Sequence, residues 1–349
     1  MTTAINKILI IGPSWIGDMV MAQALFKALK ADNPTVSIDV LALAWTKPLL
    51  DRMPEVNQSI TMPISHGVFG WKMRKQIGHD LRQEQYDQAI VLANSWKSAL
   101  IPWFANIPIR TGWRGEMRYG LLNDIRRLDE QALPMMVQRY VSLAYPPSES
   151  HIAPSYPIPL MVAETPKPEF NFTLDAQQKR LIFCPGAEFG PAKQWPATQY
   201  AELATTLLSQ GWQLLILGSA ADKSIADEIV SHINMTESSA IFNLCGETQL
   251  SDAIDLLSTA DLVISNDSGL MHIAAALQTP LIAVYGPTSP SFTPPLAGNA
   301  QIIQLDVDCG PCFQRVCPEG HHRCMKNISS EQILTLISKG IDNDVHTII

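Results

Sequence analysis

The sequence contains no apolar run of about 18 residues, the length that a membrane-spanning helix needs. Its first residues lack the basic and then apolar order of a secretion signal. Only 17% of the residues are charged, and the net charge of -8 leaves no positive excess, which argues against non-specific nucleic-acid binding. Six cysteines in 349 residues are too few for a disulfide scaffold. We therefore expect a cytoplasmic protein with reduced thiols and no nucleic-acid partner.

The arrangement of apolar runs indicates two α/β domains, because 349 residues exceed what one hydrophobic core usually serves. Short β-rich runs alternate with amphipathic stretches from residue 7 to 104 and again from 180 to 285, the pattern of doubly wound parallel sheets. Prolines accumulate in residues 145–168, which we interpret as a linker between domains 1–160 and 169–349. Ser329 and Gln332 fit a capping box that opens a last helix over 331–341, without indicating the half on which it packs.

Ligands of open parallel sheets bind beyond the carboxyl ends of the strands, and the first such loop is residues 12–19. Gly12 and Gly17 have the separation of a phosphate-binding P-loop, but Asp18 and Met19 stand where that motif needs Lys and Ser or Thr. The G-x-G-x-x-G order of a dinucleotide site is also missing. A carboxylate beside glycines suits a general base. A first-turn aspartate stabilised by the helix dipole is the alternative.

The loop over residues 184–196 has features of a diphosphate site. Gly186 and Gly190 permit an open backbone, and Lys193 precedes a helix with Pro196 in its first turn. A helix N-terminus already favours anions, so a lysine there indicates an anionic ligand. A solvated surface lysine is the alternative on this segment alone.

Residues 263–272 run from a buried strand through polar residues into a helix. Ser268 and Gly269 at the helix start offer hydroxyl and N–H donors to phosphate oxygens. Asp267 suits a sugar hydroxyl, and His272 lies one turn after Ser268 on the same face. A structural histidine is the alternative for His272.

Residues 110–127 hold five arginines against only Glu116 and Asp124. Because arginine binds phosphate and carboxylate bidentately, this segment indicates an anionic acceptor. The residues that we assign to the acceptor are Lys97, Arg110, Arg114 and Arg118.

Four cysteines form a C-x2-C-x4-C-x6-C pattern, with His321 and His322 inside it; they are Cys309, Cys312, Cys317 and Cys324. Structural zinc fits four thiols in a short loop, although the spacing is not that of paired C-x-x-C sites, and free thiols are the alternative. The Asp306-Val307-Asp308 match to the D-x-D of metal-dependent sugar transferases is too short to carry weight. We expect no catalytic metal.

Five ordered segments resemble the ADP-heptose:lipopolysaccharide heptosyltransferases: GPSWIGDMVMAQAL, RTGWRGEMRYGLLND, CPGAEFGPAKQWP, NDSGLMHIAAAL and YGPTSPSFTPPL. The resemblance implies a GT-B architecture of two Rossmann-like domains facing across a cleft, with the acceptor on the N-terminal and the nucleotide sugar on the C-terminal domain. It implies ADP-L-glycero-D-manno-heptose as donor, without a required cofactor. The implied acceptor is the first heptose of a heptosylated Kdo2-lipid A, met at the cytoplasmic face of the inner membrane.

The resemblance also assigns roles to residues. Asp18 corresponds to the base and Lys193 to a diphosphate contact that assists catalysis. The remaining donor-site residues are Glu188, Asp267, Ser268, Gly269 and His272. Glu188 and Phe189 depart from relatives of the first-heptose type, which have hydroxyl residues in that loop.

Three other functions are weaker interpretations. A nucleotide-sugar epimerase needs no separate acceptor and leaves the arginine segment unexplained. A non-catalytic nucleotide-sugar or glycan-binding protein predicts binding without transfer. A dehydrogenase is disfavoured by the missing glycine fingerprint.

Overall fold

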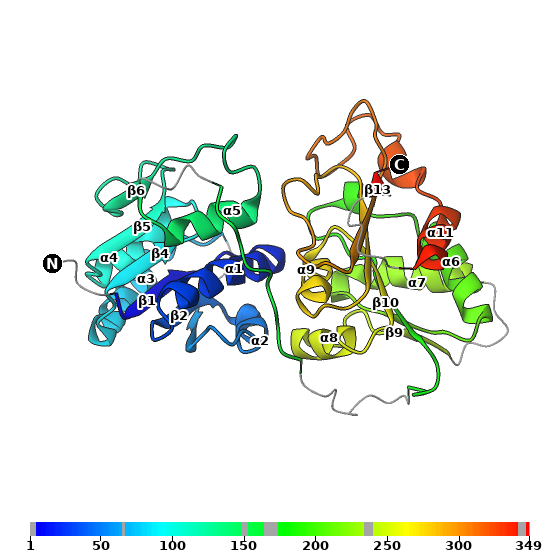
Figure 1. The fold of residues 1–349 in the computed structure, drawn as a ribbon, viewed down its shortest axis with the longest axis horizontal. Coiled ribbons are helices and arrows are strands. Elements are labelled where there is room, and N and C mark those ends of the chain that lie inside the picture. Colours follow the sequence, from blue (N-terminus) through cyan, green and yellow to red (C-terminus); the bar gives the residue numbers. More distant parts are fainter. Residues whose placement is uncertain are drawn as a thin grey trace. The chain divides into compact units, whose positions relative to one another are not determined.

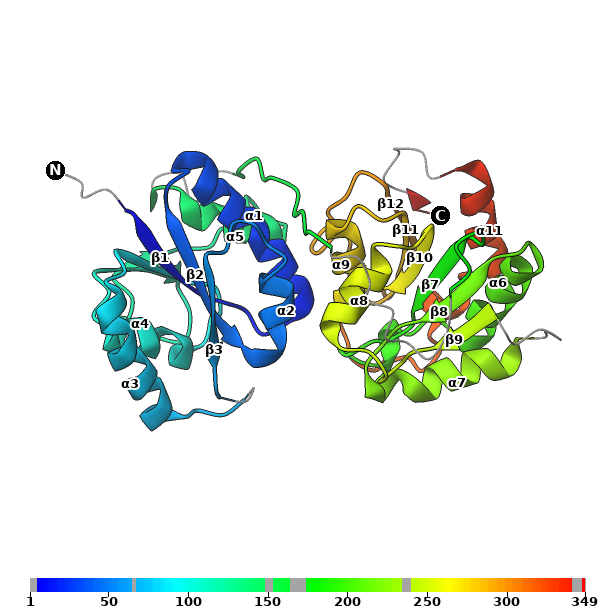
Figure 2. The same cartoon turned by 90° about the horizontal axis from the view of Figure 1, so that it is seen from below.

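The computed structural model describes residues 5–64, 67–147, 153–163, 174–233, 240–340 and 347–348. The chain divides into two compact units, Met1–Val162 and Ala163–Ile349, coloured from blue to green and from green to red in Figures 1 and 2. Much of the expected linker, residues 148–152 and 164–168, lies outside the described residues. Each unit is described by itself below.

The first unit is a six-stranded parallel sheet in the order β3-β2-β1-β4-β5-β6, the strand order of a Rossmann fold. Its strands are β1 (Lys7–Ile11), β2 (Ser37–Leu43), β3 (Gln58–Met62), β4 (Gln88–Val91), β5 (Ile109–Trp113) and β6 (Asp124–Arg126). Its helices are α1 (Ile16–Asp32), α2 (Lys47–Leu50), α3 (Trp71–Asp80), α4 (Leu100–Phe104) and α5 (Met136–Val141). The central strands are apolar runs because helices cover both faces of such sheets.

Part of the expected linker is fixed to this unit. The buried Gln23 side chain of α1 donates to the Leu160 carbonyl at 2.6 Å and accepts from the Leu160 N–H at 3.1 Å. The Val162 N–H donates to the Arg52 carbonyl at 3.0 Å. The chain therefore runs along the first unit as far as Val162.

The second unit repeats the same strand order and adds one strand, giving β13-β12-β11-β10-β7-β8-β9. Its strands are β7 (Arg180–Cys184), β8 (Gln213–Ile216), β9 (Ile241–Asn243), β10 (Leu262–Asn266), β11 (Leu281–Tyr285), β12 (Ala300–Gln304) and β13 (Thr347–Ile348). Its helices are α6 (Ala197–Ser209), α7 (Lys223–His232), α8 (Leu250–Leu257), α9 (Gly269–Ala276), α10 (Arg323–Lys326) and α11 (Ser330–Lys339). The α/β class expected from the sequence is confirmed.

The last described helix, α11, belongs to the second unit. The Ser329 side chain caps it by accepting from the Gln332 N–H at 3.2 Å, as the sequence predicts. The next residue, Ser330, bonds to Gln199 and Glu202 of α6 at 2.7 and 2.8 Å. Among the described residues, no helix is long and apolar enough to cross a membrane.

The strand order sets where ligands bind in each unit. It reverses direction between β1 and β4 in the first unit and between β7 and β10 in the second. At such a switch point the two following loops diverge to opposite faces and leave a crevice. The loops that open at these points are 12–15 and 92–95 in the first unit, and 185–196 and 267–268 in the second, each with the first turn of the helix that follows it.

Candidate active site

A cavity of about 730 Å³ lies at the switch point of the first unit. The loops after β1 and β4 form much of its wall, and Arg139 and Tyr140 of α5 complete part of it. This volume is typical of a small-molecule site.

Asp18 lines this cavity from the first turn of α1. Its carboxylate is hydrogen-bonded to the hydroxyl of Tyr140, and burial together with Asp18 raises the pKa of Tyr140 well above its usual value. The phenol therefore stays protonated and donates to the carboxylate. The helix dipole also stabilises the charged Asp18 carboxylate in the first turn of α1. Asp18 can therefore be both a first-turn aspartate and a base that faces the cavity.

Three cationic side chains line the same cavity: Arg74, Lys97 and Arg139. The Arg74 guanidinium is buried and donates to the carbonyls of Phe69 at 2.7 Å and of Lys97 at 3.3 Å. The Arg139 Nε atom donates to the Leu133 carbonyl at 2.9 Å. Sequence reasoning identified Lys97 alone, because Arg74 and Arg139 come from α3 and α5, which it did not predict.

The structure places Arg110, which the sequence assigns to the acceptor, away from this cavity. This residue lies at the amino end of β5, the edge of the sheet opposite to the cavity. Its Nε atom donates to the Leu121 carbonyl at 2.6 Å, and one terminal nitrogen donates to the Ile107 carbonyl at 2.5 Å. Five residues of strand span roughly 16 Å, so the Arg110 side chain is too far away to reach the cavity.

The sequence also assigns Arg118 to the acceptor. Its side chain is buried and donates to the Ala93 carbonyl at 2.8 Å, to Asn94 Oδ1 at 2.7 Å and to the Trp113 carbonyl. Burial lowers its pKa. Because Ala93 and Asn94 line the cavity, Arg118 positions the loop after β4. Arg114 is exposed directly after Trp113, and its acceptor role stays a prediction.

At the switch point of the second unit, Lys193 and Asp267 form an ion pair. Lys193 Nζ lies 2.6 Å from Asp267 Oδ2, and both side chains are largely buried. The hydroxyl of Thr288 donates to the same oxygen at 2.6 Å, and the Phe189 ring lies 4.9 Å from the ammonium. The structure therefore joins two residues that the sequence assigned separately. It adds Thr288 of the YGPTSPSFTPPL segment to them.

Ser268 and Gly269 occupy the start of α9, as expected. Ser268 is the N-cap, and Gly269 is the first helical residue. The neighbouring Asn266 fixes this helix start against the loop after β7, because its amide donates to the Pro185 carbonyl at 2.6 Å and accepts from the Trp195 N–H at 3.2 Å. The free N–H groups at the N-terminus of α9 therefore lie beside the ion pair of Lys193 and Asp267.

His272, in the first turn of α9, is also buried. Burial lowers its pKa to about 4, although Asp267 opposes the shift. The imidazole is therefore neutral near pH 7. Glu188 is exposed in the loop before Lys193, and its donor role stays a prediction.

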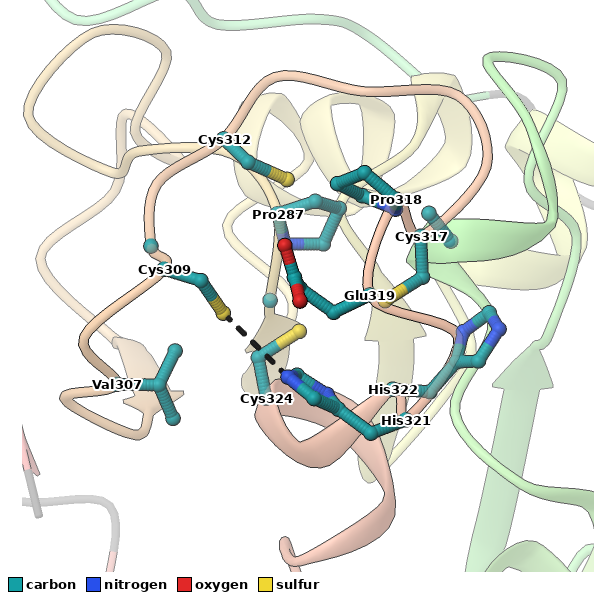
Figure 3. A pocket seen from close by; sticks show the side chains of 13 residues that line it. Pro287, Val307, Cys309, Cys312, Cys317, Pro318, Glu319, His321, His322 and Cys324 are labelled. Carbon is teal, nitrogen blue, oxygen red and sulfur yellow. Dashed lines mark hydrogen bonds between the residues drawn. The ribbon is translucent and has the colours of Figure 1, made fainter.

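The four clustered cysteines line a cavity of about 20 Å³ together with Glu319 and His321 (Figure 3). All four are free thiols, and Cys309 Sγ lies 3.9 Å from His321 Nε2. Over the residues that the structure describes, no group of three or more Cys, His, Asp or Glu side chains is placed to hold a metal ion. The loop gathers the four cysteines around one small cavity, and the structural zinc option stays a prediction.

Comparisons with known proteins show which family this chain is similar to. The model of the family described as "Glycosyltransferase family 9 (heptosyltransferase)" matches residues 74–323. Lipopolysaccharide heptosyltransferase 2 of Salmonella typhimurium is 50% identical over 335 residues, which cover 94% of this chain and 96% of that protein. Lipooligosaccharide heptosyltransferase 2 of Haemophilus ducreyi is 48% identical over 343 residues, covering 94% and 97%.

Solved structures of heptosyltransferases are also similar to this chain. The structure of E. coli ADP-heptose lps heptosyltransferase II shares 46% identity, covers 96% of this chain and 98% of that chain, and superposes with a TM-score of 0.84. The E. coli heptosyltransferase WaaC with ADP shares 18% identity over 95% and 99% of the two chains, with a TM-score of 0.69, a likeness of fold.

Proposed function

Because this chain belongs to glycosyltransferase family 9, the heptosyltransferases, we propose that it transfers L-glycero-D-manno-heptose from ADP-heptose to the first heptose of a Kdo2-lipid A inner core. The observation that carries this proposal is about 50% identity to two proteins named heptosyltransferase 2, over 94% of the chain. The reaction belongs to lipopolysaccharide biosynthesis.

The two units take different substrates in this proposal. The first, residues 1–160, binds the acceptor, because its cavity has room for sugars and holds a carboxylate suited to a base. The second, residues 169–349, binds the nucleotide sugar, because Lys193 and the N-terminus of α9 offer positive charge and N–H donors to a diphosphate. In the reaction, the hydroxyl of the acceptor bound to the first unit attacks the anomeric carbon of the nucleotide sugar bound to the second unit.

Asp18 accepts the proton of the acceptor heptose hydroxyl as that oxygen attacks the anomeric carbon from the face opposite ADP. The new carbon–oxygen bond forms as the bond to the diphosphate breaks, so the configuration inverts through an oxocarbenium-like transition state. The Tyr140 hydroxyl bonds to Asp18 and holds the carboxylate in place. The negative charge leaves with ADP.

Lys193 stabilises that departing charge although it is already paired. Its ammonium has three N–H donors, and Asp267 occupies only part of them with its carboxylate at 2.6 Å and its carbonyl at 3.3 Å. Asp267 and Thr288 therefore fix the ammonium in advance, which reduces the reorganisation needed in the transition state. Ser268 and Gly269 add donors at the helix start, and no step of this mechanism uses a metal or a cofactor.

The acceptor contacts in this proposal are Lys97 in the cavity and Arg114 beside it. Arg74 and Arg139 add positive charge to the wall, which suits the carboxylates of Kdo residues. Because the acceptor carries a lipid anchor, the enzyme works in the cytoplasm at the inner face of the membrane.

The test is ADP release from ADP-heptose with and without monoheptosylated Kdo2-lipid A, while the mass of the glycan is followed. Acceptor-dependent ADP with one added heptose is expected. Turnover of the nucleotide sugar without acceptor would indicate an epimerase. Binding of ADP-heptose without any transfer would indicate a sugar-binding protein and would overturn the proposal.

A further inference from the structure

An exposed group of aromatic side chains lies on the first unit at the start of α3. The rings of Phe69, Trp71 and Trp96 are nearly parallel, with centroids 6.1 to 6.5 Å apart. Phe69 is 48% exposed and Trp71 is 42% exposed. Val68, Met73 and Trp103 are also more than 40% exposed. Large apolar side chains gathered at the surface mark an interaction site.

The rings of this group pack against helix α4 of the first unit. Phe104 of α4 packs edge-on against Trp71, with centroids 5.2 Å apart, and against Trp103 at 4.9 Å. Gly78 of α3 lies directly against Phe104, so the two helices are in close contact. The exposed rings therefore form a fixed platform.

The charges on the segment that carries Phe69 and Trp71 are of one sign. No acidic residue occurs from Gly67 to His79, whereas Lys72 and Lys75 are exposed on α3. Arg74 points inward and bonds to backbone carbonyls. The solvent-facing charges on this stretch of α3 are thus lysines, and aromatic rings beside lysines are typical of surfaces that rest in a membrane interface.

The platform continues into the cavity that holds Asp18. That cavity is lined by Phe69, Trp96, Arg74 and Lys97. Four residues of α3 that face solvent lie outside it: Trp71, Lys72, Met73 and Lys75. The Trp96 N–H also donates to Glu116 at 2.5 Å, and the next residue, Met117, is 81% exposed. A lipid surface at the platform would therefore lie next to the acceptor cavity.

We propose that the docking surface formed by Val68, Phe69, Trp71, Met73 and Trp103 with Lys72 and Lys75 rests on an anionic bilayer. Its aromatic rings enter the interface and its lysines meet the lipid headgroups. It thereby presents the cavity to an acceptor anchored in the same leaflet. The identity of that acceptor rests on the proposed function; the affinity for a bilayer does not.

The binding test is co-sedimentation of the intact protein with phosphatidylcholine vesicles, with or without phosphatidylglycerol. Binding to the anionic vesicles that weakens with salt is expected. The Lys72→Glu/Lys75→Glu variant should bind roughly tenfold more weakly or worse, since each basic residue contributes separately. The control is Lys326→Glu/Lys339→Glu, which makes the same charge change at exposed positions of the second unit.

A second variant tests the aromatic part. Trp71→Ala should weaken vesicle binding at high salt, whereas Trp45→Ala, at a similarly exposed tryptophan of the first unit, should not. Thermal melting of each variant verifies folding. Equal binding of the native protein to neutral and anionic vesicles, or unchanged binding of the α3 variants, would overturn the proposal.

Kinetics separate docking from catalysis. The α3 variants should keep native turnover on a delipidated, water-soluble acceptor and lose turnover on the same glycolipid embedded in anionic vesicles. Equal losses on both acceptors would assign these residues to the cavity and reject docking. If the native protein binds vesicles but transfers no heptose to either acceptor, the proposed function fails while the docking surface stands.

Discussion

At the scale of single residues, Asp18 carries the strongest prediction. Replacing Asp18 by Asn keeps the shape of the side chain and removes its basicity, so the turnover number should fall by roughly 10² to 10⁴. Tyr140→Phe should cost less, because it removes one hydrogen bond to the base and leaves the base itself. The measurement is acceptor-dependent ADP release. Near-native turnover of a correctly folded Asp18→Asn protein would reject the base.

Variants of the Lys193–Asp267 ion pair should change folding stability and activity differently. Lys193→Gln leaves Asp267 buried without its counter-charge, a change that typically costs about 3 kcal/mol in folding free energy. The Lys193→Gln/Asp267→Asn double variant removes both charges and should regain part of that stability. It should not regain activity, because the positive charge for the diphosphate is still missing.

The measurements for this pair are thermal melting and the KM for ADP-heptose together with the turnover number. Lys193→Gln should raise that KM and lower turnover. A double variant with native donor kinetics would show that Lys193 serves the fold and not the diphosphate.

His272 predicts a stability change on the acid side. Its pKa is about 4 in the folded protein and about 6.5 in an unfolded chain, so the unfolded state binds the proton more tightly. The stabilisation is therefore complete above pH 6.5 and is lost as the pH falls toward 4, by about 3 kcal/mol in total. His272→Asn should flatten this dependence in urea unfolding followed between pH 4 and 7. An unchanged slope would place the titration elsewhere.

Residues near the switch points were predictable from the sequence, and the arginines were not. The rule that ligands bind beyond the carboxyl ends of strands led to Asp18, Lys193 and Asp267. Composition alone suggested that Arg110 and Arg118 face an anion. Whether a guanidinium meets solvent or a backbone carbonyl depends on tertiary packing, which no local pattern encodes.

At the scale of elements, the sequence predicted the buried strands well and the polar ones poorly. β1, β2 and β11 are short runs of mostly apolar residues, so the alternation expected over residues 7–104 and 180–285 includes them. β3 at the edge has no fully buried residue, and β6 is only three residues with Asp and Arg at its ends. Their pairing is decided by the sheet beside them, so the sequence gives little signal for them.

The contact between α3 and α4 gives an element-scale prediction. Alanine usually stabilises a helix relative to glycine by about 1 kcal/mol. At Gly78, however, an added Cβ would lie 2.4 Å from Phe104 Cβ and 2.8 Å from the Ile101 carbonyl oxygen. Gly78→Ala should therefore destabilise the protein by about 1 to 3 kcal/mol. Gly298→Ala, where nothing lies within 4 Å, is the control in thermal melting; equal melting temperatures would contradict the close packing.

At the scale of the whole molecule, the two units use the same strand order for different chemistry. Each places a loop after its first strand opposite the loop after its fourth strand. The first unit puts an acid there, and the second puts a lysine paired with an aspartate. The common fold therefore fixes the location of both sites, and a few loop residues fix what each site does.

The division at Val162 predicts that the donor site survives separation. Each unit has its own sheet and its own buried core, so fragments 1–162 and 163–349 should each fold and melt cooperatively. Calorimetric titration should then show ADP binding to fragment 163–349 within about tenfold of the intact chain, a difference of roughly 1.4 kcal/mol. Fragment 1–162 should not bind ADP, because the Lys193 pair and the α9 N-terminus are in the other fragment. ADP binding by fragment 1–162, with none by a folded fragment 163–349, would reverse the assignment of the two units.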